Sequence, residues 1–172
     1  RQVQKGGFQM GIIFGESGEN LILIDDRGRV TDSEKYTALV SLIVLKAGFG
    51  GSLVLPYTAS TTIEAMAEDY GVKVIRTKSN PSNWMNEILK AGGQDDSARL
   101  QYALNFDAVW GAGGIISFLV DKGMRLSELV DELPEFHYIK REIECSWQDK
   151  GRVIKEIVSR NKGSNMELFE GV

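Results

Sequence analysis

The chain has 172 residues, a formal net charge of −4 and an isoelectric point near 5.1, with 42% hydrophobic and 26% charged residues. This length allows one ordinary domain, or one domain with part of a neighbour, and the composition is typical of a folded globular protein. The acidic balance gives no general attraction to nucleic acid or to an anionic membrane surface, so we expect neither as a partner.

Signals for targeting are absent from the sequence. The sequence contains no run of about 18 apolar residues, the length needed to cross a membrane, and residues 1–10 lack the apolar core of a signal peptide. The single cysteine, Cys145, cannot form an intrachain disulfide, which fits a reducing compartment. We therefore expect a cytoplasmic protein. The chain opens at Arg1 and stops at Val172 just after an apolar run begins, so we also expect a piece of a longer protein.

The first predicted elements are two strands at residues 8–14 and 20–24. β-branched and aromatic residues dominate both, and the loop between them has turn chemistry. Thr31 and Glu34 have capping-box spacing, which predicts a helix that runs to about Lys46. Because apolar residues cover most of its circumference, we expect this helix to be buried on both sides.

Strands and helices then alternate. Short apolar runs at 52–56 and 72–75 predict strands that are covered on both faces. We expect Thr61 to cap one helix, and Asn80 to cap another that has Pro81 in its first position. The alternation indicates crossover units around a mostly parallel sheet. The predicted fold class is α/β: a three-layer α/β/α domain with a mostly parallel sheet, preceded by a β-hairpin and followed by the start of an α+β domain.

The last third of the chain breaks this alternation. Residues 91–99 are polar and precede a long apolar helix, which we predict from about Asn105 to Lys122. A shorter helix begins at Ser127. Beyond it, residues 136–144 alternate like a strand, and residues 146–160 have the pattern of an amphipathic helix.

Three stretches occur in one order along nearly the whole chain: GIIFGESGENLILIDDRGRVTDSEKY, SLVLPYTASTTIEAMAEDYGVKVIRT and FDAVWGAGGIISFLVDKGMRLSELVDELPEF. Together they resemble the phosphohexomutases, the phosphomannomutase and phosphoglucomutase family. The resemblance implies that residues 1–29 end the family's second domain, that 30–133 form its third, and that 134–172 begin its fourth. The family's phosphoserine nucleophile belongs to the first domain and its phosphate-binding loop to the late fourth, so neither is expected in this chain.

The family's magnesium loop has an altered counterpart here. Where the family carries D-G-D-G-D-R, with three aspartates that bind Mg²⁺, this chain has Gly15-Glu16-Ser17-Gly18-Glu19-Asn20. Only Glu19 keeps a carboxylate at an aspartate position, so Glu16, Ser17 and Glu19 form a degenerate metal set. Mg²⁺ demands octahedral hard oxygens at short distances, and the lost carboxylates would have offset its dehydration. We expect no bound Mg²⁺; the alternative is a weak or rearranged site.

A second family loop, of G-E-x-S type in the third domain, reads sugar hydroxyls. Its counterpart here is Gly92, Gly93, Gln94 and Asp95, which keeps the two glycines but has Gln94 where a glutamate is usual. No histidine follows. These four residues are the candidates for binding a hexose phosphate, and a solvated loop is the alternative.

Three further features have simpler explanations. Thr58-Ala59-Ser60 resembles the start of the nucleophile motif T-A-S-H-N-P, but no histidine is near in sequence to serve as a base, so helix capping is the better account. The small residues Gly111–Gly114 lie inside an apolar helical run, which favours close helix packing over a phosphate loop. His137, the only histidine, is expected to be structural.

The leading hypothesis for function is a phosphohexomutase-like region of sugar phosphate metabolism whose reaction centre has degenerated. This chain alone is then expected to be catalytically inactive. Residues 134–153 look like the branch fused behind sugar-1-phosphate nucleotidyltransferases, which implies an assembly or regulatory role beside that enzyme, and an oligomer is compatible with it. One alternative is part of an active phosphohexomutase, which moves a phosphoryl group between the 1- and 6-positions of a hexose. Another is an unrelated nucleotide-binding α/β domain, although neither G-x-G-x-x-G after the first strand nor a P-loop is present.

Overall fold

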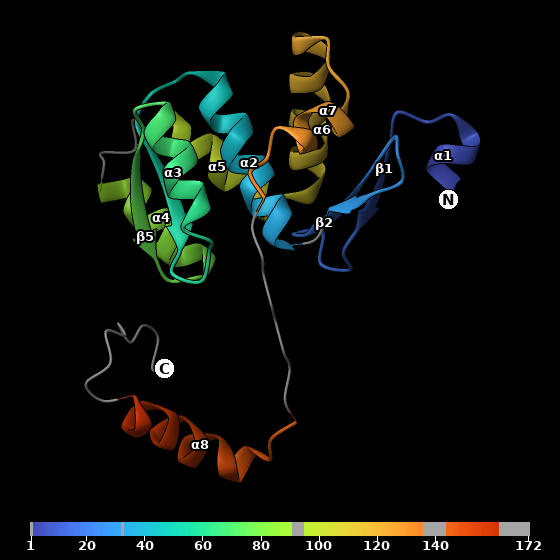
Figure 1. The fold of residues 1–172 in the computed structure, drawn as a ribbon. Coiled ribbons are helices and arrows are strands. Elements are labelled where there is room, and N and C mark those ends of the chain that lie inside the picture. Colours follow the sequence, from blue (N-terminus) through green and yellow to red (C-terminus); the bar gives the residue numbers. More distant parts are fainter. Residues whose placement is uncertain (1, 32, 91–94, 136–143, 162–172) are drawn as a thin grey trace. The chain divides into compact units, whose positions relative to one another are not determined.

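A computed structural model describes the chain over residues 2–31, 33–90, 95–135 and 144–161 (Figure 1). The chain divides into two compact units, residues 1–136 and 137–172. The predicted boundary after residue 29 falls inside the first unit, and the division into three domains stays a prediction.

A three-stranded antiparallel sheet opens the first unit, after a short helix α1 (Gln2–Gly6). Its strands, in spatial order, are β1 (Met10–Phe14), β2 (Leu21–Asp25) and β3 (Val30–Thr31). β1 and β2 form the predicted hairpin, in which Ile13 pairs with Ile22. Because side chains alternate along a strand, Leu21 and Leu23 of β2 are buried in the core while Ile22 is exposed.

The second sheet is parallel and lies between two layers of helices. It pairs β4 (Ser52–Pro56) with β5 (Lys73–Thr77). Leu53 and Leu55 join one core cluster and Val54 joins another, because they point to opposite faces. The helices on the first face are α2 (Ser33–Ala47) and α3 (Thr62–Asp69), and those on the second are α4 (Pro81–Lys90) and α5 (Asp96–Phe106) (Figure 1). The predicted α/β class, with helices on both faces of a parallel sheet, is confirmed.

Helix α2 is buried around most of its circumference, as expected from its sequence. Tyr36 and every residue from 38 to 45 are buried. Gly48 follows the helix with a positive φ of 74°, so the chain can turn toward β4. At the other end, α2 begins at Ser33 and Thr31 belongs to β3. Asp32, between them, lies outside the described residues.

The region from 95 to 122 differs from the prediction. A polar loop and one helix from Asn105 were expected, but the structure has α5 and then a separate helix α6 (Ala108–Lys122). Asp107 both ends α5 and begins α6: its backbone N–H donates to the Ala103 oxygen at 3.2 Å, and its side chain accepts from the Trp110 N–H at 2.8 Å. Capping side chains hydrogen-bond locally to the backbone, so a single aspartate is enough to separate two helices.

Helix α7 (Leu126–Asp131) closes the first unit and begins one residue before the predicted start. Within the described residues, no single helix has the length and apolar content to cross a membrane. The pair α5 and α6 passes that test only when the two are taken together, and their axes are bent by 119°.

In the second unit, α8 (Trp147–Arg160) matches the predicted amphipathic helix. The Ser146 hydroxyl caps it by accepting from the Asp149 N–H at 3.2 Å. No residue of α8 is buried. The strand predicted at 136–144 lies, except for its last residue, outside the described part of the chain.

Candidate functional site

The predicted counterpart of the family's metal loop, Gly15–Asn20, is a tight turn between β1 and β2. The Gly15 N–H donates to the Asn20 oxygen at 2.7 Å, and the Gly18 N–H donates to the Gly15 oxygen at 3.0 Å. Gly18 has a φ of 72°, a conformation that glycine adopts without steric cost. The Gly18 oxygen accepts from the Ala108 N–H at 2.9 Å, which ties the loop to the first residue of α6.

The candidate metal ligands Glu16, Ser17 and Glu19 are all exposed on this loop. The Ser17 hydroxyl accepts a long hydrogen bond from the Glu19 N–H, at 3.4 Å. Across the described ranges, no group of three or more histidine, cysteine, aspartate or glutamate side chains is placed to hold a metal ion. Two exposed carboxylates and one hydroxyl are a poor fit for Mg²⁺, which needs more charge to lose its water. The alternative of a weak or rearranged Mg²⁺ site therefore stays a prediction, and no group of metal ligands among the described residues supports it.

Asp95 is the one residue of the predicted sugar loop that the structure describes; Gly92, Gly93 and Gln94 lie outside the described residues. Its Oδ1 accepts from the Ala98 N–H at 2.9 Å and so caps α5. Its Oδ2 accepts from the Ser52 N–H at 2.9 Å and from the Ser52 hydroxyl. A side chain at Gly51 would collide with this carboxylate. Protein donors thus surround Asp95, and its predicted contact with a sugar remains untested.

Gln101, further along α5, also accepts a hydrogen bond from the backbone of β4. Its Oε1 accepts from the Val54 N–H at 2.7 Å, and its side chain is fully buried. Together, Asp95 and Gln101 provide acceptors along the edge of β4 that β5 does not cover, where another strand would otherwise pair. Sequence reasoning missed this role because it assigned residues 91–99 to a loop. The Asp95-Asp96-Ser97 start is a helix N-terminus signal that could have found α5.

Ser60 caps α3, as the sequence predicts. Its hydroxyl oxygen accepts from the Thr62 N–H at 3.2 Å and lies 2.9 Å from the Thr62 hydroxyl. The predicted capping role of Thr61 is wrong: Thr61 occupies the cap position but has a helical backbone and makes no side-chain cap bond. Because Thr61 already has helical φ and ψ angles, the capping oxygen comes from the residue before it, Ser60. At α4 the prediction holds, because Asn80 Oδ1 accepts from the Asn83 N–H at 2.9 Å.

Gly111 confirms the expected close packing of the small-residue run. A Cβ placed there would lie 3.0 Å from the Leu104 oxygen, 3.3 Å from the Tyr36 hydroxyl and 3.4 Å from Leu21 Cδ2. The Tyr36 hydroxyl donates to the same Leu104 oxygen at 2.5 Å, and burial raises the pKa of Tyr36. Gly111 therefore lets α6 approach α5 and α2 closely.

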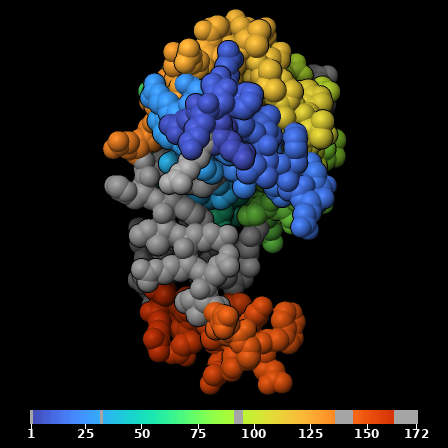
Figure 2. All heavy atoms as spheres, turned by 90° about the vertical axis from the view of Figure 1, so that its right-hand side faces the viewer, coloured from blue at the N-terminus to red at the C-terminus, as the bar shows by residue number. Residues whose placement is uncertain are grey.

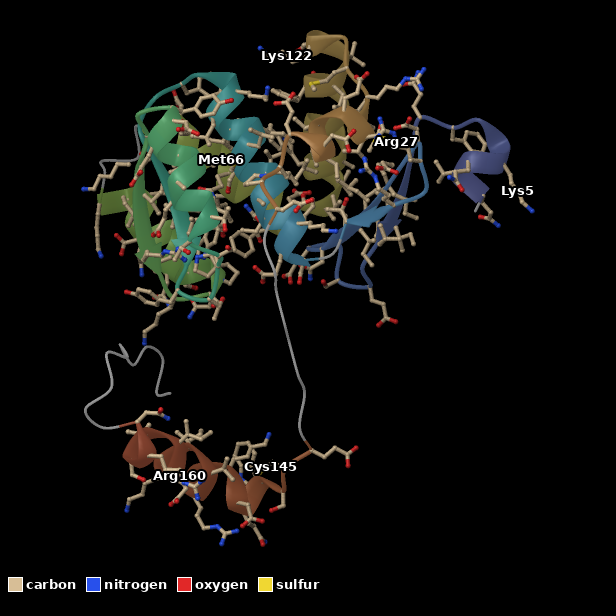
Figure 3. All side chains as sticks on the ribbon, in the orientation of Figure 1. Lys5, Arg27, Met66, Lys122, Cys145 and Arg160 are labelled. Carbon is tan, nitrogen blue, oxygen red and sulfur yellow. The ribbon has the colours of Figure 1, made fainter. Side chains whose placement is uncertain are left out.

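A cluster of charged side chains, which the sequence did not reveal, joins the β2–β3 turn to α7. Asp25 is fully buried, and its carboxylate accepts from the Arg27 N–H at 3.0 Å, the Arg29 N–H at 2.8 Å and Arg29 Nε at 2.6 Å. Arg29 also donates to Asp131 at 2.6 Å and to the Ser127 oxygen at 2.9 Å. Hydrogen bonds to Asp131 and Asp25 raise the pKa of Arg29. Figure 3 shows Arg27 beside α7, where it donates to Asp131 at 2.6 Å.

Known proteins resemble this chain in sequence. No family model matches it. It is 26% identical over 172 residues to a phosphoglucomutase/phosphomannomutase of Thermococcus kodakarensis, an alignment that covers 96% of this chain and 38% of that protein. It is also 26% identical over 159 residues to a phosphoglucosamine mutase of Methanococcus vannielii, covering 89% and 36%. The chain thus spans well under half the length of these relatives.

Solved structures share its fold. A Thermus thermophilus protein described as a phosphomannomutase has a TM-score of 0.60 and 14% identity, over 72% of this chain and 30% of that one. The Paramecium phosphoprotein pp63/parafusin, a phosphoglucomutase in its open form, has a TM-score of 0.54 and 14% identity, over 74% and 24%. At this identity the structures show the fold alone. Named relatives and shared fold together support a region of phosphohexomutase type.

Proposed function

We propose that this chain is the third-domain region, with its flanks, of a phosphohexomutase-like protein of sugar phosphate metabolism, and that it is catalytically inactive by itself. The order of the three resembling stretches and the names of the relatives support the first part. The loop Gly15–Asn20 carries the second part: it occupies the place of the family's magnesium loop, but its carboxylates are few and exposed.

The chemistry of the family explains why this loop determines whether the chain can be catalytically active. Phosphoryl transfer depends on positioning and on neutralising the negative charge of the transferred group, and Mg²⁺ supplies much of that neutralisation. The residues here do not fit the ion. The Ser60 hydroxyl, the other group that invites a catalytic interpretation, is occupied in capping α3. No described residue takes the role of nucleophile in this proposal.

The role we propose for the intact protein is assembly or regulation next to a sugar-1-phosphate nucleotidyltransferase. Its support is the resemblance of residues 134–153 to the fused branch. The exposed apolar side chains Val153, Ile154 and Ile157 of α8 are compatible with a helix that packs on further protein. A hexose phosphate bound at residues 92–95 would be the regulatory ligand.

Calorimetric titration with Mg²⁺ tests the altered loop. We expect no binding heat from the natural chain. A matched variant that restores the family pattern, with Gly15→Asp, Glu16→Gly, Ser17→Asp, Glu19→Asp and Asn20→Arg, is expected to bind the ion because three carboxylates return to the turn. Submillimolar binding by the natural chain that is lost in Glu19→Ala would contradict the proposal.

An activity assay and a binding screen separate the alternatives. Conversion of hexose 1-phosphates to 6-phosphates by the full-length protein would favour the active phosphohexomutase over the inactive module. Saturation-transfer measurements against hexose phosphates and nucleotides test the ligand. Binding of a hexose phosphate that Gln94→Ala weakens supports the regulatory site, whereas binding of nucleotides alone favours the unrelated nucleotide-binding domain.

A further inference from the structure

The first part of helix α5, with its cap, covers the edge of β4 that β5 leaves open. The Tyr57 N–H donates to β5, so by the alternation of a strand the backbone groups of Ser52 and Val54 face away from β5. The Ser52 N–H donates to the Asp95 carboxylate at 2.9 Å. The Val54 N–H donates to Gln101 Oε1 at 2.7 Å. Side chains of the helix thus take the place of a neighbouring strand.

Polar contacts, more than apolar ones, hold this part of α5 in place. Among residues 96–100, the fully buried apolar side chain is the small Ala98, and Leu100 is partly exposed. The Ser97 hydroxyl donates to the Gly50 oxygen and so adds a third side-chain attachment to the same edge. The net contribution of one hydrogen bond to stability is small, because water replaces the partner when the bond opens. The attachment of this part is therefore weak for a core helix.

The last part of α5 is anchored in the apolar core. Leu104 is fully buried, and its backbone oxygen accepts from the Tyr36 hydroxyl. A Cβ at Gly114 of α6 would lie 3.0 Å from Leu104 Cδ2, so α6 packs closely on this part. Figure 2 shows α6, in yellow, at the surface beside the N-terminal strands in blue. The last part of α5 therefore stays fixed when the first part moves.

Gln101, between these two parts, favours opening. Its Oε1 is bonded to Val54, but its Nε2 is buried without a partner among the described residues. An unpaired buried donor costs free energy, and water satisfies it once the site opens. The chain before β4 can also adjust, because Gly50 and Gly51 have positive φ values of 70° and 87° and glycine is conformationally permissive. Opening thus loses hydrogen bonds to β4 but restores the hydration of this amide.

We propose that residues 95–101 form a cover over the edge of β4, which opens as one unit while the last part of α5 stays in place and the chain remains folded. Local unfolding of such a segment requires less free energy than unfolding of the whole chain. Opening exposes the N–H groups of Ser52 and Val54 to water, and an uncovered strand edge is a template for pairing with another chain. The cover therefore controls access to this edge.

Amide hydrogen exchange of the 172-residue chain, followed by NMR at increasing urea below the unfolding transition, tests the cover. The N–H groups of Leu53 and Leu55 face β5, so they provide a control within the same strand. We expect Ser52 and Val54 to be protected about tenfold or more weakly than Leu53 and Leu55, and to depend little on urea. Equal protection of all four amides overturns the proposal.

A matched pair of variants provides the second measurement. Asp95→Asn places an amide donor against one of the donors that the carboxylate now accepts from, so Ser52 and Val54 should both exchange about tenfold faster. Asp96→Asn, at the exposed neighbouring carboxylate, should leave both rates nearly unchanged. Acceleration at Ser52 without Val54 would show that the bonds open independently, and it overturns the proposal. If Asp95→Asn fails to fold, the comparison within the natural chain still decides.

Discussion

Asp131 links α7 to the β2–β3 turn, two parts of the chain that are distant in sequence, through hydrogen bonds between side chains. It accepts from Arg29 and from Arg27 of the β2–β3 turn, each at 2.6 Å, although it belongs to α7. These two guanidinium groups, Arg29 first, hold the pKa of Asp131 below its ordinary value of 3.8. The ionised form of Asp131 is therefore the one that the folded chain favours.

The stability of the first unit should depend on pH through this carboxylate. Its pKa is lower in the folded chain, so its contribution is complete above pH 3.8 and is lost as the pH falls through the folded pKa. Asp131→Asn should destabilise the chain at neutral pH, and the difference from the natural chain should shrink in acid. Urea unfolding at several pH values measures this. Asp121→Asn, at an exposed carboxylate on α6, is the control; a difference that stays constant from neutral pH to acid would contradict the argument.

Gln101 gives a second prediction at the residue scale. Gln101→Leu keeps an apolar volume at the site but leaves the buried Val54 N–H without its acceptor. An unsatisfied buried donor costs about 1–3 kcal/mol, but Gln101→Leu also removes Gln101 Nε2, a buried donor without a partner among the described residues. The free energy of unfolding should therefore fall by about 1 kcal/mol, at the lower end of that range. Arg99→Leu, at an exposed position of the same helix, should change it by less than about 0.5 kcal/mol. Equal effects in the two variants would show that the hydrogen bond to Val54 contributes nothing.

The sequence predicts local contacts of this kind better than distant ones. The capping oxygens of Ser60 and Asn80 lie within three residues of the groups they bind, and both were predicted. Gln101 and Val54 are 47 residues apart, and Arg29 and Asp131 are 102 apart. No pattern within either stretch identifies its partner, because the pairing depends on how the helices pack.

Among the elements, α5 was missed for a physical reason. Its buried residues include Ser97 and Gln101, which are polar because they bond to the backbone around β4. The apolar period of a helix is then weak, and the stretch has the pattern of a loop. By contrast, α2 and α8 were predicted closely, because the first is apolar nearly all round and the second has one clear apolar side.

Helix α6 offers a matched pair of glycines for a prediction at the element scale. Gly113→Ala meets nothing within 4 Å, so it should stabilise the chain by up to about 1 kcal/mol through helix propensity. Gly111→Ala gains the same propensity but crowds the Leu104 oxygen and the Tyr36 hydroxyl. We expect it to be less stable than Gly113→Ala by about 1–3 kcal/mol. Thermal unfolding of both variants checks this, and equal melting temperatures would mean that α6 moves away from α5 at no cost.

For the whole molecule, the α/β class could be predicted because alternating strands and helices determine layers. The degenerate metal loop stays a prediction from the sequence, based on Gly15 and Ser17 at positions where the family carries aspartates. The chain covers 38% of its Thermococcus relative, so the activity and partners of a whole protein of that kind stay proposals.

The hydrogen bond from the Ala108 amide to the Gly18 oxygen has a practical consequence. The chemical shift of an amide responds to the length of its hydrogen bond, so the ¹⁵N resonance of Ala108 reports on the conformation of a turn that is remote in sequence. One isotope-labelled nucleus can therefore register whether an ion or a sugar has reached the hairpin tip, without any probe being attached to the turn.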